Sequence, residues 1–299
     1  MDDLTFWIVA GILGILALVF FGKYIKTSMF YFAGMDFDQA VKKTLKIPVG
    51  DVDLQGYLYL PKFSLAEDGK PTEKLPLIIY CQGWGGHGEQ VFFKEIMVAL
   101  AVGGPYAVLT ADTRGFGKSP GKKVLGVQLL EDAAKVIDFG ANLDVIDPSR
   151  IGVYGGSFGA VIALTVGYVD ERVKAIVVQC ATNDLKANFT RKPESLKARF
   201  NMAMLKSMGV DGAKISEEMN QKMSPSGVID PGRPDLNNRV FLIHAKDDPA
   251  VNFQEFEKNR AALGLPDDQV QVYKTGGHTE MRQELLTIAG ALRFFKSKL

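Results

Sequence analysis

The chain has 299 residues, of which 47% are hydrophobic and 23% are charged, enough to bury the core of one large α/β domain. Lysine and arginine number 35 against 34 acids, so the sequence has no excess of basic residues that would indicate nucleic-acid binding. The three histidines are scattered, and no H-E-x-x-H or C-x-x-C spacing occurs. We therefore expect no metal site, and no motif indicates a cofactor.

The first predicted element is an apolar helix at Leu4–Gly22, which contains no charged residue. A helix of about 19 residues rises roughly 28 Å, close to the thickness of a bilayer core. Acidic residues precede the run and bulky residues end it, whereas a signal peptide has a positively charged start and a small-residue cleavage site. A buried core helix would normally carry a polar stripe, and this run has none. We expect a transmembrane anchor within residues 1–22 and a juxtamembrane linker over 23–41. Lysines follow the run, which places the rest of the chain in the cytoplasm.

From about residue 42 short apolar strands alternate with helices. This alternation is typical of βαβ crossovers, and runs such as AIVVQC are apolar throughout, as in strands buried on both faces. The sequence predicts an α/β fold with a mostly parallel eight-stranded sheet and helices on both faces. The predicted strands are 42–48, 52–60, 77–81, 106–112, 151–154, 173–180, 240–245 and 269–274. The predicted helices are 89–102, 127–142, 158–168, 253–263 and 280–298.

One segment, at about residues 183–238, interrupts the alternation. It contains a helical run, PESLKARFNMAMLKSMG, and five of the ten methionines. The segment lies between two predicted core strands, at the carboxyl edge of the sheet, where open α/β sheets bind ligands. Methionine side chains adapt to apolar ligands of varied shape. We expect a helical cap insertion over the site.

A G-x-S-x-G motif at residues 155–159 follows an apolar strand and precedes an apolar helix. In that context the motif forms a tight turn that exposes the serine hydroxyl above the sheet, and glycines are needed because side chains two residues either side would collide. The sequence therefore predicts Ser157 as a nucleophile. The alternative is a serine in an ordinary glycine-rich turn.

A serine hydroxyl needs a base that takes its proton, and histidine is the usual one. His87 precedes the predicted nucleophile and His244 lies within a predicted strand, whereas His278 lies in a loop, TGGHTE, that is free to reach Ser157. We predict His278 as the base. The acid that orients it should follow the strand VFLIHA, where Asp247 and Asp248 are adjacent and spacing hardly separates them.

The negative oxygen formed by attack of the serine needs two preorganised N–H donors. One predicted donor is the backbone N–H of Phe158, directly after the nucleophile. The loop CQGWGGHGEQ follows the strand at 77–81, and its glycines allow close backbone approach. It is predicted to supply the second donor, the backbone N–H of Trp84.

The motif order and the fragments QGWGG, DTRGFGKS, HAKDDPAV and TGGH resemble the α/β-hydrolase superfamily, and most of all its prolyl-oligopeptidase-like and dienelactone-hydrolase-like esterases. The resemblance covers about residues 42–299, and it implies an α/β-hydrolase fold. The relatives carry H-G-x-x-D-x-x-V after the seventh strand. Aligning His244 and Val251 with that pattern implies Asp248 as the acid, with Ala245 in place of the family glycine.

The resemblance implies a serine hydrolase with a Ser157–His278–Asp248 triad. The apolar cap favours small-molecule carboxylic esters with an apolar acyl or aryl group, including feruloyl-type esters. A small serine peptidase is the alternative, although the chain has no room for the β-propeller of prolyl oligopeptidases. An aminopeptidase would need acids in the cap, and Glu217 and Glu218 are candidates. An acyltransferase or thioesterase could use the same triad.

Overall fold

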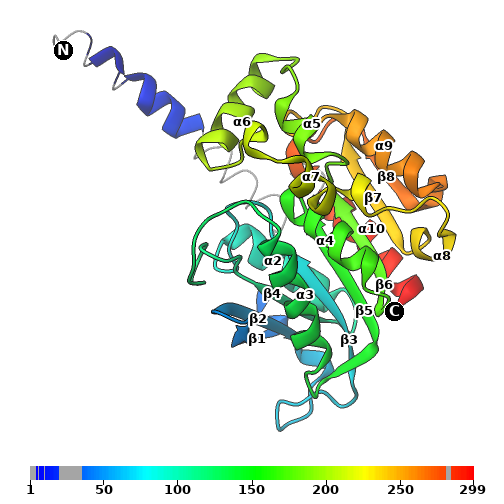
Figure 1. The fold of residues 1–299 in the computed structure, drawn as a ribbon. Coiled ribbons are helices and arrows are strands. Elements are labelled where there is room, and N and C mark those ends of the chain that lie inside the picture. The colour runs from blue at the N-terminus through cyan, green and yellow to red at the C-terminus, as the bar shows by residue number, and fades with distance from the viewer. Residues whose placement is uncertain (1–4, 6, 10, 20–35, 281–283) are drawn as a thin grey trace. The chain divides into compact units, whose positions relative to one another are not determined.

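The computed structural model describes residues 5, 7–9, 11–19, 36–280 and 284–299. The chain divides into two units, Met1–Asp36 and Phe37–Leu299. The second unit contains a central sheet and the helices that cover it (Figure 1). Each unit is described by itself below.

The sheet of the second unit has eight strands in the order β1-β2-β4-β3-β5-β6-β7-β8. The pairs β1–β2 and β2–β4 are antiparallel, and from β4 onward all neighbours are parallel. The predicted α/β fold with a mostly parallel sheet is therefore confirmed. The strands are β1 (Ala40–Pro48), β2 (Asp53–Pro61), β3 (Leu75–Cys81), β4 (Ala107–Ala111), β5 (Ile146–Gly156), β6 (Val173–Gln179), β7 (Val240–Ala245) and β8 (Val270–Tyr273).

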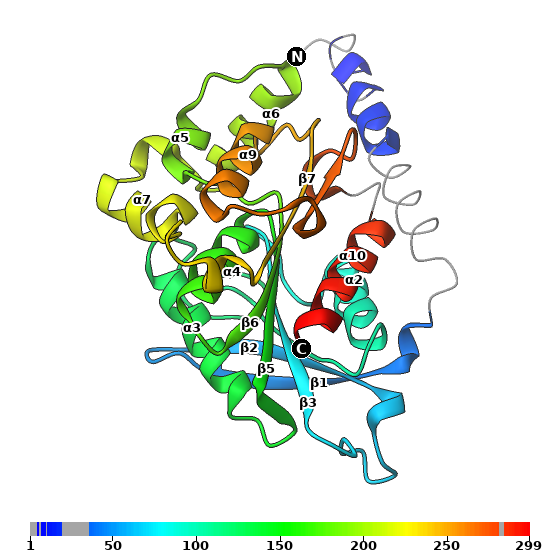
Figure 2. The same ribbon diagram turned by 90° about the vertical axis from the view of Figure 1, so that its right-hand side faces the viewer.

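Helices cover both faces of this sheet, because strands buried on two sides need apolar cover on each. Figure 2 shows α3 and α4 on one side of the strands and α2 and α10 on the other. The helix α9 contacts β7. These five helices are α2 (Val91–Val102), α3 (Gln128–Ala141), α4 (Phe158–Val169), α9 (Phe253–Leu263) and α10 (Glu284–Lys298).

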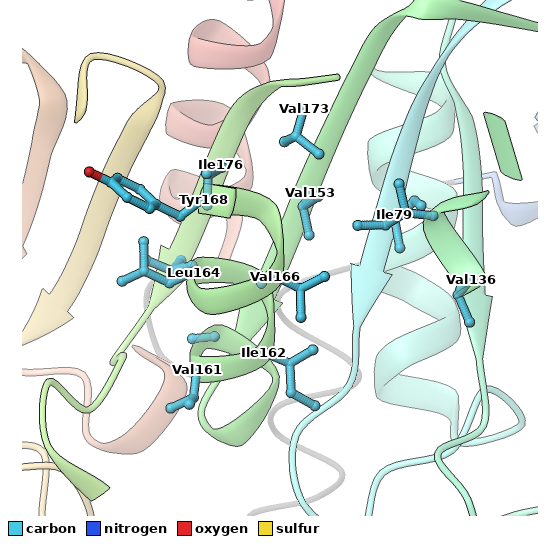
Figure 3. Close-up of a cluster of buried hydrophobic side chains, with 14 of the residues drawn as sticks. Ile79, Val136, Val153, Val161, Ile162, Leu164, Val166, Tyr168, Val173 and Ile176 are labelled. Carbon is cyan, nitrogen blue, oxygen red and sulfur yellow. The ribbon is translucent and has the colours of Figure 1, made fainter. Parts of the chain in front are cut away.

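The helix α4 lies within the hydrophobic core, since it is apolar around its whole circumference. Eleven of its twelve residues, 158–168, are buried. Figure 3 shows its side chains between the sheet and neighbouring elements, with Val153 and Ile176 contributed by β5 and β6. Because α4 begins directly after Ser157, this packing fixes the position of the serine.

Between β6 and β7 the chain forms an insert of four helices in place of a single crossover helix. It begins after β6 ends at Gln179 and returns to the sheet at Val240. Side-chain caps start three of its helices, with Asp184, Ser195 and Ser216 each accepting a hydrogen bond from a backbone N–H in the first turn. The helices are α5 (Leu185–Thr190), α6 (Leu196–Ser207), α7 (Glu217–Met223) and α8 (Pro234–Asn237).

The predicted membrane-anchored, cytoplasm-facing localisation is contradicted. Thirteen described residues between 5 and 19 are helical. A helix that crosses a bilayer core of ~30 Å needs about 20 residues. Within the described ranges, no helix has the length and apolar character needed to cross a membrane. The end of the predicted anchor, residues 20–22, and most of the predicted linker, residues 23–35, lie outside the described residues.

Candidate active site

Ser157 lies in a strained turn between β5 and α4. Its φ of 58° and ψ of −126° are values that residues with a side chain rarely adopt. The turn is tight because a Cβ on Gly155 would lie 2.2 Å from the Gly159 carbonyl oxygen, and one on Gly159 would lie 2.0 Å from the carbonyl oxygen of Cys81. The backbone N–H of Ser157 donates to the carbonyl of Gln179 at 3.0 Å, which ties the turn to β6.

The contact at Gly159 gives a stability prediction. Gly159→Ala is expected to lower the free energy of unfolding by about 3 kcal/mol, and Tm by ~10 °C, because the added methyl group overlaps a backbone oxygen that cannot move aside. Thermal denaturation followed by circular dichroism measures the shift. Gly126→Ala is the matched control, since a Cβ there meets no atom within 4 Å. Equal Tm values for the two variants would show that the turn tolerates a side chain.

His278 reaches Ser157 from the loop after β8. Its Nε2 lies 2.8 Å from the Ser157 Oγ, and its Nδ1 lies 2.9 Å and 3.1 Å from the two carboxylate oxygens of Asp248. An ionised carboxylate only accepts hydrogen bonds, so Nδ1 carries the proton and Nε2 of the neutral ring accepts from the serine hydroxyl. The structure brings these three predicted residues together in one chain of hydrogen bonds.

The two adjacent aspartates after β7 have different partners. Asp248 is buried, and its Oδ1 also accepts from the backbone N–H groups of Ala250 and Val251 at 2.7 Å and 3.0 Å. Asp247 instead accepts from the N–H groups of Gly276 and Gly277 at 2.8 Å and 2.7 Å. Asp248 therefore holds the imidazole, and Asp247 holds the backbone of the loop that carries it.

The pKa values of the pair shift in opposite directions. Burial lowers the pKa of His278, but the charge of Asp248 and its hydrogen bond outweigh burial and raise that pKa above its ordinary value. Burial raises the pKa of Asp248, yet the charge and hydrogen bond of His278 outweigh it and hold that pKa below the ordinary range. The pair is therefore arranged to stabilise a charged imidazole.

Gln179 is a supporting residue that the sequence analysis missed. Its carbonyl accepts from Ser157, and its side-chain Nε2 donates to the carbonyl of Thr279 at 3.3 Å. The hydroxyl of Tyr154 donates to its Oε1 at 2.6 Å. Gln179 thus connects the serine turn with the histidine loop. A buried glutamine at the end of an apolar strand was the available signal.

The glycine-rich loop after β3 passes directly beside Ser157. A Cβ on Gly83 would lie 3.5 Å from the Cβ of Ser157. The rings of Trp84 and Phe158 are in edge-to-face contact, with centroids 5.3 Å apart. Phe158 is the first residue of α4, where backbone N–H groups have no partner within the helix. The two predicted N–H donors therefore lie in neighbouring segments next to the serine.

Two pockets open beside Ser157 and share Trp84, Ser157, Leu205 and His278. The narrow pocket has a volume of about 20 Å³, and the wide pocket about 220 Å³. The insert contributes to both. The other narrow-pocket residues are Phe158, Val161, Thr182, Leu185, Phe189, Val210, Ala250 and Val251. The other wide-pocket residues are Tyr80, Gly83, Phe93, Ile96, Gly156, Gln179, Met204, Met208 and Thr279.

Two comparisons with solved structures agree with this architecture. An acylaminoacyl peptidase from Pyrococcus horikoshii is similar with a TM-score of 0.64 and 17% identity, covering 90% of this chain and 43% of the peptidase. Est1E from Butyrivibrio proteoclasticus, solved with ferulic acid, is similar with a TM-score of 0.58 and 20% identity, covering 85% and 98% of the two chains. At these identities the similarity concerns the fold.

Sequence comparison identifies relatives as well. The quorum-quenching protein AidA of Acinetobacter baumannii is 31% identical over 171 residues, which are 55% of this chain and 52% of AidA. The match therefore spans about half the length of that relative. A family model, the prolyl oligopeptidase family, matches residues 93–299, which include Ser157, Asp248 and His278. The chain belongs to the prolyl oligopeptidase family and has the α/β-hydrolase fold.

Proposed function

We propose that this protein hydrolyses carboxylic esters with an apolar acyl or aryl group, with Ser157 as nucleophile, His278 as base and Asp248 as the orienting acid. The observation that carries the proposal is the 2.8 Å contact between the Ser157 Oγ and the His278 Nε2 at the meeting point of two apolar pockets. A nucleophile and its base within hydrogen-bond distance, with the base held by a third group, are the arrangement that acyl transfer requires.

In the proposed reaction, the Nε2 of His278 takes the hydroxyl proton as the Ser157 Oγ attacks the ester carbonyl carbon. The resulting imidazolium is stabilised by Asp248, and it then donates the proton to the leaving alcohol as the C–O bond breaks. Water replaces the alcohol, gives a proton to His278 and attacks the acyl-enzyme. Release of the acid returns the proton to the serine and restores the enzyme.

We assign stabilisation of the negatively charged oxygen to the backbone N–H groups of Trp84 and Phe158. The position of both residues beside Ser157 supports this role, as does the first-turn position of Phe158 in α4. Donors of this type lower the barrier because they are fixed before the charge develops, and the loss of one typically costs about 10²–10³ in kcat. Gln82 stands where relatives carry histidine, but a backbone donor does not depend on that side chain.

The surroundings of the site support an ester over an aminoacyl substrate. An aminopeptidase needs an acid to bind the substrate amine. Among the described residues that line the two pockets, none is an aspartate or glutamate. The candidate acids Glu217 and Glu218 are exposed and form ion pairs with Lys186 and Lys222. Acyltransferase and thioesterase reactions use the same three side chains and differ in the attacking or leaving group.

A substrate panel tests the proposal. We expect p-nitrophenyl and feruloyl esters to be hydrolysed with a kcat/KM at least about 100-fold higher than aminoacyl p-nitroanilides. Added methanol or a thiol should not replace water as the main acceptor of the acyl group. Efficient anilide cleavage with no ester turnover would assign the site to a peptidase. Transfer of the acyl group mainly to the added alcohol or thiol would assign it to an acyltransferase.

The pH dependence follows from the state of His278. Only the neutral imidazole accepts the serine proton, so kcat/KM should fall as the pH drops through the pKa of His278 in the free enzyme. Because that pKa is raised, the acid limb of the profile is expected at a higher pH than an ordinary histidine would give. A kcat/KM profile for one p-nitrophenyl ester measures it. An acid limb at a lower pH than an ordinary histidine would give would mean that Asp248 does not stabilise the charged ring.

A further inference from the structure

Four apolar side chains of the insert are exposed along one side of α6. Leu196, Phe200, Met204 and Met208 follow one another at intervals of four residues, with exposed fractions of 83%, 70%, 43% and 43%. We call these four residues the α6 stripe. Side chains four apart are neighbours on a helix surface, and twelve residues rise about 18 Å. A continuous exposed apolar surface of this kind often marks a binding site.

The α6 stripe is continuous with the wide pocket. Met204 and Met208 belong to the stripe and also line the wide pocket together with Ser157 and His278. Exposure rises along the stripe with distance from this pocket, up to the 83% of Leu196. The stripe therefore extends the apolar lining of the pocket from the nucleophile toward the solvent.

One hydrogen bond and one close approach place α6 beside the loops of the site. At its carboxyl end, the indole Nε1 of Trp84 donates to the carbonyl oxygen of Met208 at 2.9 Å. Near its amino end, the Nζ of Lys197 lies 3.9 Å from the position of a Cβ on Gly277, the residue before His278. The helix thus extends from the loop that carries Trp84 toward the loop that carries His278, and its stripe lies beside the site.

The shapes of the two pockets indicate which kind of substrate group can follow this surface. At about 20 Å³ the narrow pocket has room for little more than one water molecule, whereas the wide pocket has about 220 Å³. Among the described residues of the wide pocket, none is a lysine, arginine, aspartate or glutamate. The wide pocket therefore fits an uncharged flexible chain, and methionine side chains adapt to such a chain.

We propose that the wide pocket and the α6 stripe together bind the acyl chain of long-chain fatty acid esters, with the chain leaving the pocket along Met208, Met204, Phe200 and Leu196. This inference rests on the proposed ester hydrolysis at Ser157 and names its substrate class. Each methylene placed on the stripe loses contact with water, and the free energy gained lowers the barrier for acylation as long as the chain stays on the stripe.

The test uses the full chain and p-nitrophenyl esters of butanoic, octanoic, dodecanoic and hexadecanoic acids, kept below their critical micelle concentrations. We expect kcat/KM of the wild-type protein to rise from the butanoyl to the dodecanoyl ester. In the double variant Leu196→Ser with Phe200→Ser, the ratio of kcat/KM for the dodecanoyl ester to that for the butanoyl ester should fall about tenfold. Both replaced side chains are largely exposed, so the variant should fold.

Arg199→Ser is the matched control, because Arg199 is an exposed residue of α6 outside the stripe, and its whole chain-length profile should equal that of the wild type. A wild-type profile that does not rise beyond the butanoyl ester would overturn the acyl-chain inference. An unchanged ratio in the double variant would do the same, and would assign the stripe to a protein partner or a second copy of the chain. No turnover of any ester, the butanoyl ester included, would instead overturn the proposed function.

Discussion

Ser157→Ala is expected to lower kcat for a p-nitrophenyl ester by roughly 10⁴- to 10⁶-fold, because no other group replaces the proposed nucleophile 2.8 Å from His278. Labelling by a fluorophosphonate should disappear at the same time, since the reagent reacts with the activated serine hydroxyl. A discontinuous or continuous assay of p-nitrophenol release measures the loss in kcat. Gel-based detection of the labelled protein measures the second.

Two controls show that a loss of activity in Ser157→Ala comes from the missing hydroxyl group. The melting curve of Ser157→Ala should resemble that of the wild type, since the change removes one oxygen atom and leaves the backbone of the turn in place. Ser226→Ala, a change at an exposed serine of the insert, should retain both activity and labelling. Turnover near the wild-type rate in Ser157→Ala would remove the nucleophile assignment and the mechanism built on it.

Asp248→Asn should cost about 10⁴-fold in kcat, because an amide at this position can donate to Nδ1 of His278 and so favour the ring tautomer with its proton on Nε2. A ring protonated at Nε2 cannot accept the proton of Ser157. The same change removes the charge that raises the pKa of His278, so the acid limb of any residual activity should move to lower pH. Kinetics at several pH values measure both effects.

Asp247→Asn is the matched variant at the neighbouring position. Asp247 accepts hydrogen bonds from the backbone of Gly276 and Gly277 and makes no contact with the imidazole in the hydrogen-bond network of the described residues. An asparagine oxygen can still accept both bonds, so we expect a loss of about tenfold or less. A larger loss in Asp247→Asn than in Asp248→Asn would reverse the two roles.

The local parts of the site could be predicted from the sequence. A strand, a G-x-S-x-G turn and an apolar helix are continuous in the chain, and the collision of side chains at Gly155 and Gly159 is a property of that turn alone. The order of strands and helices was also predictable, because each element shows its own apolar period. The predicted β7, residues 240–245, matches the observed strand at both ends.

The partners of the turn depend on contacts between distant segments. Sequence spacing left Asp247 and Asp248 open as acids, and a family pattern favoured Asp248. In the structure the contact of Asp248 with His278 joins residues thirty positions apart, and that of His278 with Ser157 joins residues 121 positions apart. Gln179 was missed for the same reason, since its contacts with Ser157, Tyr154 and Thr279 come from segments that meet only when the sheet has formed.

Hydropathy alone gave a wrong result at the amino end. The composition of residues 4–22 has the apolar character of a membrane span, but a span also needs a continuous helix of sufficient length. Within the described residues, no helix meets both conditions. Composition measures how apolar a segment is, whereas the number of consecutive hydrogen-bonded turns decides how far it reaches.

By itself, therefore, the sequence determined the fold class, the serine turn and the few histidines and aspartates that are candidate partners of Ser157. These features follow from local periodicity and from backbone geometry within a few residues. Only the tertiary structure decided which aspartate faces His278, how Gln179 joins the turn to the histidine loop, and that the apolar residues of α6 continue the lining of the wide pocket. These features depend on how elements far apart in the chain pack against one another, and no local pattern encodes that packing.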